Sequence, residues 1–215
     1  MALAVFDLDG TISRHDTLLA YVTGFLRRHP ARWPRALSTV PVLLRFLIGF
    51  ADRGELKSAL LKAALGGCTR AQLDAWTSQY VSTFLKSGVF ADALRTIAER
   101  RDRDDVLVLM SASPDLYVPE IGRRLGFAET ICTGVRWNGE LFDGALTTPN
   151  RQGAEKARCF AALRQRHPGV PTVAYANSGS DFDHLILADE AWLVNPTPAL
   201  RLEAERAHIH CVSWR

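Results

Sequence analysis

The sequence predicts an α/β fold built on a parallel β-sheet with helices on both faces. After residue 88, short apolar runs alternate with stretches of helical apolar spacing, which is the pattern of consecutive strand–helix units. Polar residues also follow three of the apolar runs directly. Ligand sites in open parallel sheets lie beyond the carboxyl ends of the strands, so these residues indicate one pocket at that edge.

The N-terminal run of residues 3–6 predicts a short buried strand, and residues 7–11 (Asp-Leu-Asp-Gly-Thr) follow it. Alternate side chains of a strand point to the same side, so Asp7 and Asp9 are expected to face one pocket. Paired carboxylates bind hard cations such as Mg²⁺, and a carboxylate is also a nucleophile toward phosphorus. The structural alternative is a strand followed by an acidic turn.

Residues 15–87 show no strand-like alternation and predict an all-helical insertion. The insertion divides the expected domains into a core of residues 1–14 and 88–215 and a helical domain of residues 15–87. Thr69 is the expected N-cap of the last helix. The expected helices cover residues 18–28, about 35–50, 56–65 and 69–85.

Residues 36–50 are apolar nearly all round, with Arg45 as their only charge. A membrane-spanning helix needs about 20 apolar residues, so this run with Pro41 is too short to span. Two interpretations remain open: a buried helix of the helical domain, or an interfacial helix in peripheral contact with an anionic membrane. The arginines that favour the second interpretation are Arg27, Arg28, Arg32, Arg35 and Arg53.

Beyond the insertion, the strand predicted at residues 105–110 ends at Ser111, and the strand predicted at 173–176 ends at Asn177. Together with Asp7, these residues place three strand ends around one pocket. Asn138-Gly139 predicts a hairpin turn. Further strands are expected at residues 130–135 and 191–194, and helices at 90–100, 119–125, 156–166 and 181–188.

Composition restricts the possible functions. A net charge of +3 over 215 residues, with interspersed acids and bases, gives no signature of nucleic-acid binding. None of the four cysteines lies in a C-x-x-C pair, so zinc and redox motifs are not expected and the thiols are expected to be reduced. No secretory signal precedes the first strand, which favours a cytoplasmic protein, associated with the inner membrane face if residues 36–50 contact lipid.

Four motifs, in order, resemble those of the haloacid dehalogenase (HAD) superfamily: residues 7–11, Ser111, Lys156 and residues 177–181. The resemblance is to subfamily IB, which contains phosphoserine phosphatase and phosphatidylglycerophosphatase C-like hydrolases. It implies a HAD-like Rossmannoid sheet with an all-helical C1 cap inserted after the first strand. It also implies a phosphatase that hydrolyses phosphomonoesters.

The resemblance assigns roles to individual residues. Asp7 would be the nucleophile that forms an aspartyl-phosphate. Asp9 would protonate the leaving group and then activate water. Ser111 and the backbone N–H of Ala112 would bind the phosphoryl oxygens, and Lys156 would neutralise the Asp7–phosphate assembly.

The same resemblance implies a Mg²⁺ cofactor held by Asp7, the Asp9 carbonyl and residue 177, with Asp181 holding a metal-bound water. The family usually has Asp where this chain has Asn177. A neutral amide oxygen there removes one negative charge and is expected to weaken Mg²⁺ binding. Asp183 lies near enough in sequence to compensate. The alternative function is a catalytically weak module that binds a phosphorylated ligand.

The substrate remains open between two classes of phosphomonoester. Asp16 lies at the spacing where phosphoserine phosphatases read the substrate amine, which favours a small metabolite such as phosphoserine. Its structural alternative is an N-cap of the following helix. The apolar run of residues 36–50, with residues 66–68 and 149–153, resembles the phosphatidylglycerophosphatase C-like subgroup, and this resemblance implies a phosphatidylglycerophosphate-like lipid phosphate.

Overall fold

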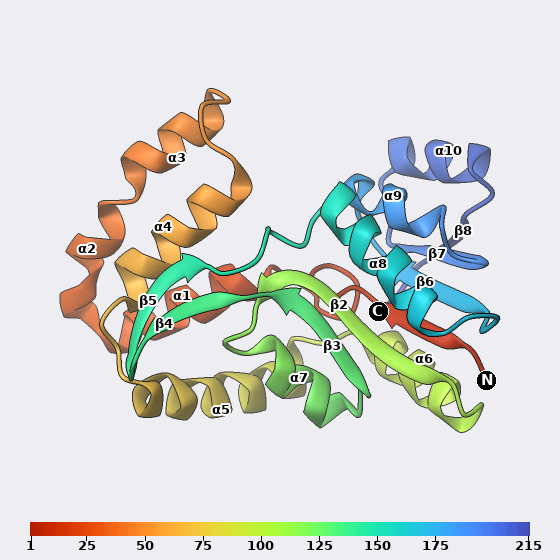
Figure 1. The fold of residues 1–215 in the computed structure, drawn as a ribbon, viewed down its shortest axis with the longest axis horizontal. Coiled ribbons are helices and arrows are strands. Elements are labelled where there is room, and N and C mark those ends of the chain that lie inside the picture. Colours follow the sequence, from red (N-terminus) through yellow and green to blue (C-terminus); the bar gives the residue numbers. More distant parts are fainter.

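The computed structural model describes residues 1–215 and contains a six-stranded, wholly parallel sheet (Figure 1). The strand order is β3-β2-β1-β6-β7-β8, which confirms the predicted α/β fold. β1 lies at the centre of the sheet, so the residues after it face the middle of the carboxyl edge. The strands are β1 (Leu3–Phe6), β2 (Val106–Pro114), β3 (Glu129–Thr133), β6 (Thr172–Ala176), β7 (Glu190–Val194) and β8 (His210–Val212).

Helices cover both faces of the sheet. β1 alternates between the two cores: Leu3 and Val5 pack with α8 to α10, whereas Ala4 and Phe6 pack with α6 and α7. All four side chains are almost fully buried, as expected for a central parallel strand. The covering helices are α6 (Ala91–Asp102), α7 (Val118–Leu125), α8 (Ala154–Arg166), α9 (Phe182–Leu185) and α10 (Pro198–Arg206). The sequence did not predict α10 and β8.

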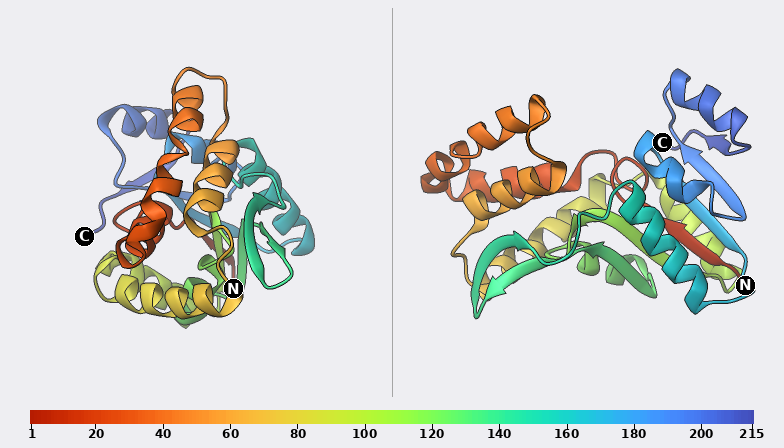
Figure 2. Two further views of the ribbon diagram at one scale, coloured as in Figure 1. Left: turned by 90° about the vertical axis from the view of Figure 1, so that its left-hand side faces the viewer. Right: turned by 45° about the horizontal axis from the view of Figure 1, so that its top comes forward.

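The predicted insertion is helical throughout and lies at one end of the molecule (Figure 2). Its first helix has Asp16 as N-cap, and its last has Thr69 as N-cap with a capping box. The domain boundaries at residues 15 and 87 stay predictions. The helices are α1 (Thr17–Arg28), the 3-10 turn η1 (Pro30–Arg32), α2 (Trp33–Leu37), α3 (Val40–Leu47), α4 (Arg53–Leu65) and α5 (Arg70–Ser87).

The Asn-Gly hairpin forms as expected, from β4 (Val135–Asn138) and β5 (Leu141–Leu146). It does not extend the main sheet; it packs on α4 of the insertion (Figure 1). Gly144 has a positive φ of 89°, and a Cβ there would lie 2.6 Å from the backbone N of Lys62. This close approach joins the hairpin to the helical insertion.

Of the two interpretations left open for residues 36–50, the buried helix was wrong in two respects. The segment is divided between α2 and α3, because Pro41 has no N–H to continue a helix across Ser38 and Thr39. No residue of α3 is buried. Its exposed apolar side chains project from the end of the insertion. No helix of the protein has the length and apolar character needed to cross a bilayer.

Candidate active site

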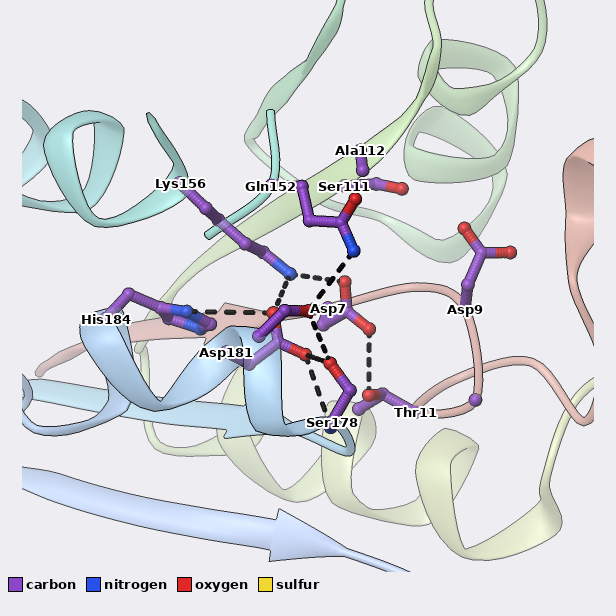
Figure 3. A network of polar contacts seen from close by, with 12 residues as sticks. Asp7, Asp9, Thr11, Ser111, Ala112, Gln152, Lys156, Ser178, Asp181 and His184 are labelled. Atoms are coloured by element: carbon purple, nitrogen blue, oxygen red, sulfur yellow. Dashed lines mark hydrogen bonds and ion pairs between the residues drawn. The ribbon is translucent and has the colours of Figure 1, made fainter. Parts of the chain in front are cut away.

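Three charged side chains from separate elements meet at the carboxyl edge of the sheet (Figure 3). Asp7 follows β1, Lys156 lies in the first turn of α8, and Asp181 follows β6. Lys156 Nζ donates to Asp7 Oδ1 at 2.5 Å and to Asp181 Oδ1 at 2.7 Å. The three side chains are only 3 to 8% exposed. One ammonium group therefore serves two buried carboxylates.

The balance between the two carboxylates and the ammonium determines which carboxyl group binds a proton first as the pH falls. Burial raises the pKa of Asp7 to about 7, against the opposing charge of Lys156. Burial acts on Asp181 too, but Lys156 and a hydrogen bond from Ser178 hold the pKa of Asp181 below its usual range. Burial disfavours the Lys156 ammonium, yet the two carboxylates hold its pKa above the usual range. Asp7 is thus the carboxyl that gains most from additional positive charge.

Thr11 and Gly10 fix the turn after β1. The Thr11 hydroxyl donates to Asp7 Oδ2 at 3.0 Å and so braces the turn. Gly10 has a φ of 77°, and a Cβ there would lie 2.0 Å from Asn177 Nδ2. Glycine therefore lets the Asn177 side chain rest against this turn, next to Asp7 in the same cleft.

Asp9 lies apart from Asp7 (Figure 3). Hydrogen bonds from the insertion and from the end of β2 hold it there. Its Oδ1 accepts from Thr17 N at 2.6 Å and Thr17 Oγ1 at 2.7 Å, and its Oδ2 accepts from Ser113 Oγ at 2.7 Å. Burial raises the pKa of Asp9. A raised pKa favours the protonated form that a general acid needs.

The end of β2 contributes Ala112 and Ser113 to the cleft surface. Ser111, the predicted phosphate ligand, is fully buried beneath them, and its Oγ accepts from Ser113 N at 3.0 Å. The Ala112 carbonyl accepts from Thr133 Oγ1 at 2.6 Å and from Lys57 Nζ of α4. A residue of the insertion therefore holds the loop to which phosphate binding was assigned.

These groups surround a cleft of about 450 Å³ between the sheet and the insertion. Burial lowers the pKa of Lys57 to about 8. Acidic side chains and the Lys156 ammonium lie on the sheet side of the cleft, and further cationic side chains line it, an arrangement suited to a phosphate ester and its ionised nucleophile. The cationic side chains beyond Lys156 are Arg14, Arg53, Lys57 and Arg151.

Several cleft residues were not predicted. Arg53 and Lys57 come from α4, and Asn150 and Gln152 come from the segment before α8. The resemblance to one HAD subgroup includes residues 149–153 but assigns them no role in the cleft. His184 packs behind Asp181, with Nδ1 3.8 Å from Asp181 Oδ1 and without a hydrogen-bond partner. Burial lowers the pKa of His184 to about 3, so the imidazole is neutral.

The remaining predicted residues are distributed as follows. Asp16 lines the cleft, and its Oδ1 accepts from Leu19 N at 2.8 Å, which confirms the N-cap interpretation. Asp183 is exposed and does not line the cleft, so the expectation that it compensates for Asn177 was wrong.

The donor chemistry around Asp7 fits a hard divalent cation. The Asp7 carboxylate, the Asn177 amide oxygen and the Asp9 carbonyl are all oxygen donors on adjoining loops, as Mg²⁺ prefers. One ammonium and two carboxylates leave a net negative charge, which a bound cation would neutralise. No cluster of three or more His, Cys, Asp or Glu side chains is placed to bind a metal, so this set has fewer anionic ligands than a typical Mg²⁺ site.

The fold and the cleft define a protein of the parallel α/β class, with a candidate nucleophile, Asp7, at the tip of the central strand. Over residues 4–185 the sequence matches the haloacid dehalogenase-like hydrolase family. The chain belongs to this family, which confirms the predicted fold and enzyme class.

Relatives with similar sequences agree with this assignment. Protein CicA of Caulobacter vibrioides is 30% identical over 195 residues, which cover 87% of this chain and 83% of CicA. A Mycobacterium tuberculosis protein named a probable phosphatase is 27% identical over 208 residues, which cover 94% of this chain and 71% of that protein. The second name agrees with the predicted phosphatase activity.

Solved structures resemble the whole chain in fold. A Bordetella pertussis protein of unknown function superposes with a TM-score of 0.77 at 20% identity, covering 98% of this chain and 97% of that one. A phosphoserine phosphatase, described as a phospho-aspartyl intermediate analogue, gives a TM-score of 0.66 at 16% identity, with 98% and 92% covered. At these identities the likeness establishes the fold.

Proposed function

We propose that the protein is a Mg²⁺-dependent phosphomonoester hydrolase that works through an aspartyl-phosphate on Asp7. The observation that carries the proposal is the buried Asp7–Lys156–Asp181 cluster at the tip of the central strand. A phosphatase needs a positioned nucleophile and positive charge around the phosphoryl group. Lys156 supplies the charge, and Thr11 fixes the orientation of the carboxylate. The name of the mycobacterial relative supports the same class of reaction.

The reaction follows from the placement of two carboxyl groups. An Asp7 oxygen attacks phosphorus, and the ester P–O bond breaks while Asp9 gives its proton to the departing oxygen. Water then attacks the phosphorus of the aspartyl-phosphate, Asp9 takes the proton, and inorganic phosphate leaves with Asp7 restored. Asp7, Asn177 and the Asp9 carbonyl would hold Mg²⁺, which would supply positive charge to offset the charge of the phosphoryl group.

The walls of the cleft support an anionic, polar reacting group. Lys156, Ala112 and Ser113 face the position of the phosphate from the sheet side. Arg53 and Lys57 face it from the insertion, in the role of a cap that covers the site. All four cysteines are free thiols, which supports a reducing, cytoplasmic environment.

The test is phosphate release from an aryl phosphate and from a panel of phosphomonoesters, with Mg²⁺ and with EDTA. We expect turnover with Mg²⁺ and its loss on chelation. Incubation with radiolabelled substrate followed by acid quench should trap phosphate on the protein. Absence of turnover and of label across the panel would contradict the proposal.

A second candidate is a module that binds a phosphorylated ligand without turnover, and Asn177 is the observation that favours it. The Asn177→Asp variant separates the two. For an enzyme, we expect the wild type to be active and the variant to bind Mg²⁺ about tenfold more tightly, because it gains one anionic ligand. For a binding module, turnover would appear only in the variant.

A further inference from the structure

The end of the insertion presents an apolar surface that no other element covers. We call it the apolar tip; it comprises Leu37, Leu43, Leu44, Leu47, Ile48 and Phe50. Leu47 and Ile48 are each 68% exposed and Phe50 is 74% exposed. The tip occupies α3 and its flanks and points away from the sheet (Figures 1 and 2). Large contiguous apolar patches of this kind mark protein or membrane contacts.

A groove connects this surface with the catalytic cleft. It has a volume of about 920 Å³ and runs between α3, α4 and the segment that joins β5 to α8. At one end it is lined by Val42 and Arg45 of α3. At the other it is lined by Arg53, Asn150 and Gln152, which also line the catalytic cleft. The groove therefore joins the catalytic cleft to the side of α3 next to the apolar tip, and its lining is mostly polar or charged.

The segment that carries the tip is positively charged, and the acidic residues Asp52 and Glu55 line the groove beside it. The 35 residues between Asp16 and Asp52 contain five arginines and no acidic residue. None of the ion pairs in the structure involves these arginines. Arg27, Arg28, Arg35 and Arg45 are exposed. Unpaired cations next to an apolar helix match the surface of an anionic bilayer.

The same charge argues against a second copy of the chain as the partner. A two-fold contact through the tip would bring one copy's arginines against the other's, with no acidic residue of this segment to offset them. A bilayer with anionic headgroups accepts both the leucines and the arginines. The charge complementarity therefore selects lipid.

We propose that the apolar tip docks on an anionic membrane, and that the substrate is a lipid phosphomonoester. Its phosphate enters the catalytic cleft, its polar headgroup lies in the groove, and its acyl chains stay in the membrane at the tip. This inference rests on the proposed phosphatase function and names its substrate class. Docking of the tip places the mouth of the groove at the lipid surface, so that the headgroup reaches Asp7 without the lipid leaving the membrane.

The test combines vesicle flotation with two activities of the full chain. Vesicles of phosphatidylcholine alone are compared with vesicles containing phosphatidylglycerol, and phosphatidic acid is the lipid substrate. The test variant is Leu44→Glu with Leu47→Glu, at side chains that are 56% and 68% exposed. The control is Ile186→Glu with Leu202→Glu, at side chains that are 60% and 58% exposed, just after α9 and in α10.

We expect the wild type and the control to float with anionic vesicles at low salt and to hydrolyse phosphatidic acid in them. The test variant should lose about tenfold or more in vesicle binding and in lipid turnover, while its turnover of a soluble aryl phosphate stays unchanged. Arg35→Gln with Arg45→Gln should weaken binding to anionic vesicles about fivefold or more and reduce its salt dependence.

Three outcomes would overturn the inference. The first is no binding to anionic vesicles with normal aryl phosphate turnover, which leaves a phosphatase of small metabolites. The second is equal lipid turnover by wild type and test variant. The third is a wild-type dimer that the test variant converts to a monomer, which assigns the tip to a second copy. Absence of aryl phosphate turnover by the wild type would instead contradict the proposed function itself.

Discussion

The two walls of the catalytic cleft are built in different ways. On the sheet wall, Asp7, Lys156 and Asp181 are buried and each is hydrogen-bonded to a side chain from another element. On the wall formed by the insertion, Asp16 and Arg53 are exposed and Lys57 is half-buried. The insertion then continues into the apolar tip, where leucines are exposed.

This difference indicates that the two walls of the cleft have different functions. Charges that are buried and mutually paired are costly to rearrange, so the sheet wall is fixed in the geometry that the chemistry needs. Side chains on the insertion are less constrained and define what enters the cleft. Substitutions on the sheet wall should remove turnover, and those on the insertion should change binding or stability while sparing the chemical step.

The largest effect is expected from Asp7→Asn. The amide cannot act as the nucleophile, so kcat should fall by at least about a thousandfold. The fold should persist, because Lys156 keeps its bond to Asp181. Asp183→Asn removes the same charge from an exposed residue outside the cleft and should leave kcat unchanged. Retention of more than a tenth of the wild-type rate in Asp7→Asn would place the nucleophile elsewhere.

Lys156→Met should affect both activity and stability. The variant leaves Asp7 and Asp181 facing each other without the ammonium between them. Removing one partner of a buried ion pair typically lowers the free energy of unfolding by about 3–5 kcal/mol. The loss of stability should become smaller as the pH falls, because protonated carboxyl groups are neutral and no longer repel each other without the Lys156 ammonium.

Chemical denaturation at two pH values measures the effect of Lys156→Met. Lys86→Met, on the exposed face of α5, is the matched control and should be nearly neutral. Equal stability of Lys156→Met and wild type at neutral pH would show that the ion pairs of Lys156 do not fix the sheet wall of the cleft.

Lys57 should produce a smaller, pH-dependent effect. Burial lowers the pKa of Lys57 from the ordinary 10.5 to about 8, so the ammonium loses its proton as the pH rises through 8. We expect KM for an aryl phosphate to rise above pH 8, because the cleft loses a cation that attracts the dianion. Lys57→Met should raise KM about tenfold at pH 7, with little change in kcat, and remove the inflection.

Two further measurements separate charge from packing at Lys57. Lys57→Arg stays protonated and should hold KM constant through pH 8. The folded state binds fewer protons than the unfolded chain between about pH 8 and 10.5, so the contribution of Lys57 to stability becomes more favourable as pH rises through that window. If Lys57→Met changed only kcat, Lys57 would act in the chemical step and not in substrate binding.

The sheet wall was largely predictable from the sequence. Asp7 and Asn177 directly follow short apolar runs, and the strand ends of a parallel sheet meet at one edge. Ser111 shows the limit of that argument, because it lies at the predicted strand end yet is buried beneath Ala112 and Ser113. Side-chain exposure at the last residues of a strand depends on where the strand actually stops, and β2 continues to Pro114.

The wall formed by the insertion was much less predictable. Nothing near Lys57 in the sequence marks it as a contact of the Ala112 carbonyl, because that contact joins residues 55 positions apart. The exposure of α3 was one of two interpretations that the sequence left open, since an apolar helix is expected to be buried unless no other element reaches it. Pro41 was a local signal for the break between α2 and α3, and a signal of this kind can be read from the sequence.

The smallest expected effect concerns Asp16, which lies on the insertion and also lines the cleft. Asp16→Ala removes the acceptor of the Leu19 N–H and should lower the free energy of unfolding by about 1 kcal/mol. Asp16→Asn keeps an N-cap oxygen, so it should restore most of that stability. Because the proposed substrate is a lipid phosphate without an amine to recognise, we expect neither variant to change KM for phosphoserine relative to an aryl phosphate. A selective KM increase for phosphoserine in both variants would assign Asp16 to amine recognition, and it would favour a small metabolite over lipid as the group that the insertion selects.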